Sequence, residues 1–168
     1  MTEQELAEKR IEVLQDALQQ VRAKKYIATG GLYVDARSRM DGVDNTCKIG
    51  QVAKSLDERG TGEACRVCAD GALLISSLRK GANDFNTVVG NTNDATKMLL
   101  FKQGLFMKDQ VDLMERYFES SHLALINDFG GASTPLSRRL SVTNYHDRMI
   151  AIFENAIKNN GIFDPNKE

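Results

Sequence analysis

The sequence predicts a mainly α fold, or an α+β fold, built as a compact single domain over residues 1–168. Only two of the 168 residues are Pro, and helix interiors exclude Pro. Apolar residues also recur every three to four positions through long parts of the chain, which is the period of an amphipathic helix. Hydrophobic residues make up 42% of the chain, and a chain of this length can bury a core without disulfide bridges.

Charge and composition exclude several classes of protein. The chain has 22 Lys and Arg against 23 Asp and Glu, so a nucleic-acid partner is unlikely on charge grounds. No apolar run approaches the ~20 residues that a membrane helix needs. The first fifteen residues carry charges throughout, so we expect neither a signal peptide nor an anchor. Three Cys is an odd count that does not fit a secreted disulfide framework, and we therefore expect a cytoplasmic protein.

The first element is a helix of about twenty residues, the length over which its apolar period holds. It opens with the capping-box spacing Thr2-x-x-Glu5, in which each side chain satisfies a free backbone N–H of the other residue. Its apolar stripe consists of Ala7, Ile11, Leu14, Leu18 and Val21.

A short hairpin or extended segment is predicted next, at 26–36. It contains Gly30-Gly31 and the β-favouring run Leu32-Tyr33-Val34. The following polar stretch, 37–62, is predicted to be an insertion or loop within the domain. A short helix within it would use Ile49, Val52, Ala53 and Leu56.

Helices account for most of the remaining chain. One is predicted to begin around Cys65 and to end at Gly81, with Gly as its C-cap. Another is marked by Met107, Val111, Met114 and Phe118. The last begins near Asn144 and ends at Gly161, and its expected buried face is Tyr145, Met149, Ile152, Phe153, Ala156 and Ile157.

The segment from Cys65 to Gly71 carries the strongest chemical signal. On one helix, Cys65 and Cys68 would share a face. A cysteine in the first turn of a helix has its pKa lowered by the macrodipole, which favours the nucleophilic thiolate. Small residues on one helix face also suit plain packing, so a buried, inert Cys68 is the competing interpretation. Gly71 inside a helix indicates a close approach by a backbone or a ligand.

Two sets of site residues follow. The catalytic set has Cys68 as nucleophile, His122 or His146 as base, and Asp128 or Asn127 to orient that base. The ligand-binding set is Gly71, Asn127 and Asp128. A zinc site needs four ligands, a number that could be supplied by Cys47, Cys65, Cys68 and one His. However, the chain has no second closely spaced pair of ligands. We therefore predict no metal and no cofactor.

The run Cys68-Ala-Asp-Gly71-Ala-Leu, followed later by Ile126-Asn127-Asp128 and a final amphipathic helix, resembles a family of uncharacterised small bacterial and phage proteins. Their pattern is a C-x-x-G-A-L helix and a later W-N-D element, and here Ile126 stands in place of the tryptophan. The resemblance implies a shared fold in which these two motifs lie near one another. It implies no activity.

Three functions fit these observations, and the sequence leaves open whether the protein is an enzyme. The first is a small binding protein, phage-encoded if the resemblance holds, that docks on a protein partner in the (host) cytoplasm. The second is an enzyme that uses Cys68 as nucleophile. The third is a protein whose pocket sequesters a small ligand. The oligomeric state is not indicated by any pattern in the chain.

Overall fold

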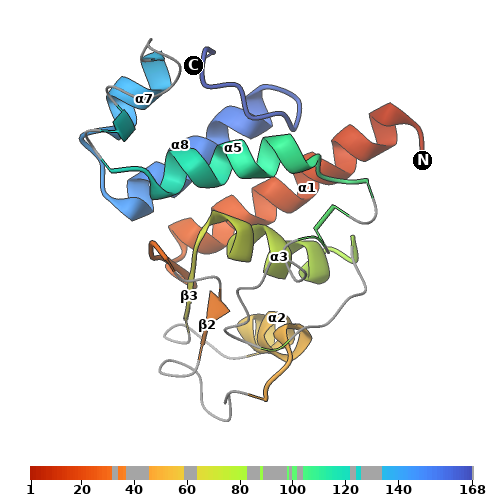
Figure 1. The fold of residues 1–168 in the computed structure, drawn as a ribbon. Helices are drawn as coiled ribbons and strands as arrows, with labels where there is room; N and C mark the ends of the chain where they lie inside the picture. Colours follow the sequence, from red (N-terminus) through yellow and green to blue (C-terminus); the bar gives the residue numbers. More distant parts are fainter. Residues whose placement is uncertain are drawn as a thin grey trace.

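The computed structural model describes residues 1–31, 34–36, 46–58, 64–82, 88, 98, 100–101, 104–121, 124–125 and 134–167 (Figure 1). Within these residues the helices are α1 (Glu3–Arg22), α2 (Ile49–Glu58), α3 (Ala69–Arg79), α5 (Lys108–Glu119), α7 (Pro135–Leu140) and α8 (Tyr145–Lys158). The strands are β1 (Tyr26–Ala28), β2 (Val34–Asp35) and β3 (Cys65–Val67). The prediction of a mainly α or α+β fold is confirmed.

Helix α1 begins at the predicted capping box. The backbone N–H of Glu5 donates to the hydroxyl of Thr2 over 3.2 Å, and the Glu5 carboxylate accepts from the Thr2 N–H. Leu14, Leu18 and Val21 of its apolar stripe are buried. Helix α1 packs against both α8 and α3 and thereby joins these two helices in the core.

The sheet is arranged differently from the predicted hairpin at 26–36. Strand β3 lies between β1 and β2, pairing in parallel with β1 and antiparallel with β2. The prediction of extended structure at 26–36 is confirmed by β1 and β2. The alternative of a hairpin is wrong, because a distant strand supplies the backbone hydrogen bonds that each short strand needs. The predicted start of the next helix, around Cys65, is also wrong, since Cys65–Val67 is a strand and α3 begins only at Ala69.

Helix α2 lies inside the stretch 37–62 that was predicted to be an insertion or loop. Its four apolar residues are buried as the spacing predicted: Ile49, Val52, Ala53 and Leu56. Because α2 packs against α3, this part of the stretch contributes to the core. The neighbouring residues 37–45 and 59–63 lie outside the described part of the chain.

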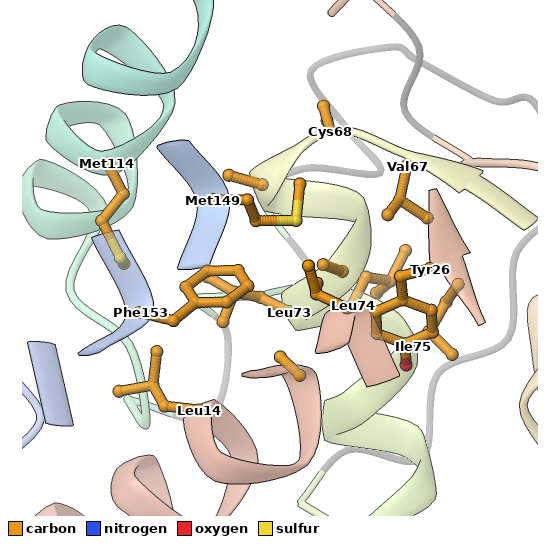
Figure 2. Close-up of a cluster of buried hydrophobic side chains, with 14 of the residues drawn as sticks. Leu14, Tyr26, Val67, Cys68, Leu73, Leu74, Ile75, Met114, Met149 and Phe153 are labelled. Atoms are coloured by element: carbon orange, nitrogen blue, oxygen red, sulfur yellow. The ribbon is translucent and has the colours of Figure 1, made fainter. Parts of the chain in front are cut away.

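Helix α3 is the centre of the structure, and every residue from Ala69 to Ser77 is buried. Helices α1, α2 and α5 all contact it, which explains why its apolar residues surround the axis instead of forming one stripe. Figure 2 shows Leu73, Leu74 and Ile75 of this helix among the apolar side chains of other elements. In the same region the hydroxyl groups of Ser76 and Tyr26 form a buried hydrogen bond of 2.9 Å.

Helices α5 and α8 complete the core around α3. The predicted face of α5 is confirmed for Val111, Met114 and Phe118, which are buried, but not for Met107, which is the N-cap of the helix and is exposed. Helix α8 begins, as expected, behind Asn144, whose side chain accepts from the N–H of Asp147 over 2.8 Å. Tyr145 was expected on the buried face but is 40% exposed, because it occupies the first position of α8 at the rim of the core.

Candidate functional site

Cys68 lies at the junction between the sheet and the central helix. It follows β3 directly and is the N-cap of α3, with extended backbone angles (φ −84°, ψ −179°). Its side chain is 4% exposed. Cys65 lies in the strand, so the two cysteines do not share a helix face, and the interpretation of a helical Cys-x-x-Cys pair is wrong.

Two glutamates of α5 face this junction. Glu115 and Glu119 are four residues apart and so lie on the same side of their helix. The sulfur of Cys68 and one carboxylate oxygen from each glutamate all lie within 4.8 Å of one another. The backbone N–H of Asp70, in the first turn of α3, donates to Oε2 of Glu115 over 3.0 Å. We call Cys68, Asp70, Glu115 and Glu119 the acidic cluster.

Burial and nearby negative charge favour the protonated forms of two members of the cluster, Glu115 and Cys68. The pKa of Glu115 is raised to about 9, first by its burial and then by the nearby charge of Asp70. The pKa of the Cys68 thiol is raised well above its ordinary value, again by burial first and then by Glu115 and Asp70. The expected lowering by the helix N-terminus is therefore wrong, although the backbone N–H of Gly71 does act in that direction.

Gly30 and Gly31, which follow β1, lie beside Glu119 of the acidic cluster. The N–H of Gly31 donates to both carboxylate oxygens of Glu119, over 2.9 and 3.1 Å. A Cβ atom on Gly30 would clash with the hydroxyl of Tyr145 and would lie 3.0 Å from Oε2 of Glu119. Gly30 thus leaves room for the Tyr145 hydroxyl and the Glu119 carboxylate to approach the same backbone.

The donor set of the cluster suits a metal cation. Thiolate sulfur and carboxylate oxygen together are ligands of zinc and of other first-row transition metals. Because the three donor atoms come from two elements that pack together, their spacing is held by the core. Three protein donors leave a fourth position of a tetrahedral centre for water or for another ligand.

The sequence interpretation found Cys68 but missed Asp70, Glu115 and Glu119. A signal for Glu115 was available, because it lies between Val111 and Phe118 on the face of α5 that the periodicity marks as buried. A glutamate inside an apolar stripe needs a partner or a function. The contact with Cys68 had no comparable signal, since the two residues are far apart in the chain.

The other predicted site residues are placed only in part. Gly71 lies in the first turn of α3, next to Cys68, and is buried. His146 is partly exposed in the first turn of α8. His122, Asn127 and Asp128 lie outside the described residues, so the catalytic set stays a prediction.

No protein-family model, curated protein sequence or solved structure matches the chain. The resemblance to small bacterial and phage proteins therefore stays a prediction as well. Across the described residues, every helix is too short or too polar to cross a lipid bilayer.

Proposed function

We propose that the protein is a small binding protein whose ligand is a divalent transition-metal cation, held by Cys68, Glu115 and Glu119. The observation that carries the proposal is the convergence of one sulfur and two carboxylate oxygens within 4.8 Å, at a packed junction of two helices. Surface acids rarely converge in this way, because like charges repel unless protons or a cation lie between them.

The mixed donor set favours particular metals. Calcium and magnesium prefer oxygen ligands alone, whereas a thiolate favours zinc or another borderline to soft cation. Zinc bonds of about 2.3 Å to sulfur and about 2.0–2.2 Å to oxygen require the three donors to close around the ion. Small movements of the two glutamate side chains along α5 would achieve this.

Metal binding must displace the protons of the Cys68 thiol and the Glu115 carboxyl, whose pKa values are raised in the metal-free protein. A coordinating thiol is deprotonated outright, and carboxylate ligands bind in their charged form. We therefore expect binding to release protons and to tighten as the pH rises. Asp70 lies behind Glu115 and is positioned to orient it through the backbone contact described above.

The other two functions receive less support from the described residues. A Cys68 nucleophile would need a thiolate, and the surroundings of Cys68 favour the thiol. Docking on a protein partner stays a prediction. The exposed large hydrophobic residues among those described come from several segments of the chain: Met1, Met98, Met107, Val142, Tyr145 and Ile162.

Titration of the metal-free protein with Co²⁺ tests the proposal. A thiolate-to-cobalt charge-transfer band should appear and saturate at one ion per chain, and Zn²⁺ should remove it. Cys68→Ser should abolish the band, and Glu115→Gln and Glu119→Gln should each weaken cobalt binding by about tenfold or more. Cys47→Ser and Asp109→Asn are matched controls, because they change a thiol and an α5 carboxylate outside the cluster.

Two results would contradict the proposal. One is a protein that shows no charge-transfer band at millimolar cobalt while circular dichroism shows it folded. The other is a band that survives Cys68→Ser and disappears with Cys47→Ser.

A further inference from the structure

Tyr145, the first residue of α8, packs against the turn of α5 that carries Glu119. The centroid of its ring lies 5.1 Å from that of Phe118, and the guanidinium of Arg148 lies 5.5 Å from it. Arg148 donates through Nη1 to the carbonyl oxygens of Phe118 and Ser120, over 2.9 and 2.6 Å. Because these two residues flank Glu119 in the sequence, the start of α8 is fixed to this turn of α5.

The hydroxyl of Tyr145 lies close to the carboxylate of Glu119. A Cβ atom on Gly30 would lie 2.4 Å from this hydroxyl oxygen and 3.0 Å from Oε2 of Glu119, so both atoms surround one point that only a glycine leaves free. A small rotation of the Glu119 side chain would bring the two atoms within hydrogen-bond distance. In the described part of the chain, the Tyr145 hydroxyl donates to no other group.

Glu119 differs from Glu115 in the kind of group that holds it. The N–H of Gly31 donates to both oxygens of the Glu119 carboxylate, and this N–H belongs to an exposed turn. When a metal binds one of these oxygens, the other can still accept a hydrogen bond. A second donor close to Glu119 would then fix the orientation of the carboxylate.

We infer that Tyr145 is a positioning residue of the metal centre, whose hydroxyl donates to the Glu119 carboxylate when that carboxylate binds the metal. This inference rests on the proposed function. The hydrogen bond would restrict rotation of the Glu119 side chain and keep one of its oxygens on the metal, as donors around metal ligands do in other proteins. Tyr145 acts through Glu119 and is not itself a ligand.

Tyr145→Phe tests the inference, because it removes the hydroxyl and keeps the ring that packs against Phe118. The metal-free variant is titrated with Co²⁺ beside the parent protein. Its affinity for cobalt should fall by about tenfold. The thiolate-to-cobalt band should still appear at saturation, since Cys68 remains a ligand. Tyr117→Phe is the matched control, because the Tyr117 hydroxyl pairs with Thr134 outside the acidic cluster.

Glutamine variants separate positioning of Glu119 from a general effect on the fold. In a Glu119→Gln background, Tyr145→Phe should change the affinity for cobalt by less than about twofold, because the carboxylate that the hydroxyl holds is gone. In a Glu115→Gln background, the same change should still cost the full factor. Circular dichroism checks that each variant is folded.

The outcomes distinguish this inference from the proposed function. If the parent protein binds cobalt and Tyr145→Phe binds it equally well, the role of Tyr145 is overturned and the metal proposal stands. Equal losses in the two glutamine backgrounds would also overturn that role, because the hydroxyl would then act through the fold. If the parent protein shows no charge-transfer band, the metal proposal fails, and the inference about Tyr145 fails with it.

Discussion

The middle of α3 and its start are both buried but contribute to the molecule in opposite ways. Leu73, Leu74 and Ile75 lie in the apolar core, where burial of each side chain favours folding (Figure 2). Cys68 and Asp70, at the start of the same helix, are buried against the glutamates of α5. Burying acidic groups costs free energy. Leu73, Leu74 and Ile75 therefore stabilise the fold, whereas the burial of Cys68 and Asp70 beside the glutamates lowers its stability.

The largest expected effect is the loss of stability when a leucine in the middle of α3 is truncated. Leu74→Ala should lower the free energy of unfolding by about 2–5 kcal/mol, because a fully buried leucine leaves a cavity. Urea denaturation followed by circular dichroism measures the change. Leu78→Ala, on the same helix but only partly buried, is the control and should cost clearly less. Equal losses for the two variants would show that α3 is not the centre of the core.

Next comes the protection of Cys68 from alkylation. In the native metal-free protein at pH 8, iodoacetamide should modify Cys68 about a hundredfold more slowly than in the denatured protein, because its thiol is buried and its pKa is raised. Peptide mass spectrometry gives the rate for each cysteine. Rapid labelling with an apparent pKa below the ordinary ~8.5 would instead favour the Cys68 nucleophile.

A smaller effect is expected from the charge of Glu115. Its pKa is about 9 in the folded protein, so between its ordinary value and pH 9 the folded state binds more protons than the unfolded state. Stability of the metal-free protein should therefore fall as the pH rises from 5 to 9. Glu115→Gln should remove most of this fall and be more stable than the parent at pH 9 by about 1–3 kcal/mol.

Thermal unfolding in EDTA at several pH values measures this effect. Asp109→Asn, an exposed change on the same helix, should keep the pH dependence of the parent protein. Because the charge of Asp70 raises the pKa of Glu115, the midpoint of the fall depends on the surrounding charges as well as on the Glu115 carboxyl group. If the stability of the parent protein instead rises from pH 5 to pH 9, Glu115 does not have a raised pKa in the folded state.

The smallest expected effect is at the glycine pair. Gly31 has φ +74°, so Gly31→Ala should cost about 1–2 kcal/mol of stability through backbone strain. It should also weaken cobalt binding modestly, because the Gly31 N–H holds the Glu119 carboxylate. Gly104→Ala has a similar φ of +70° with open space around it and is the matched control for strain alone. Equal cobalt affinities in the two variants would mean that Gly31 does not position Glu119.

Local patterns predicted the helices well and the strands poorly. Thr2 and Asn144 start their helices where the sequence indicated, and α2 has the buried face that its spacing predicted. Helix periodicity and caps depend on neighbours within four residues, which the sequence displays directly. The three short strands depend on partners far along the chain. The sequence therefore predicted extended structure or a hairpin at 26–36 without its pairing, and it placed Cys65 in a helix.

The same distinction holds for the site. The sequence alone determined that Cys68 and Gly71 lie near one another and that Val111, Met114 and Phe118 form the buried face of α5. Only the tertiary structure decided that these two elements meet. Packing of α5 on α3 brings Glu115 and Glu119 to the sulfur of Cys68. The raised pKa values of Cys68 and Glu115 follow from their burial in this packing, which no pattern of neighbouring residues encodes.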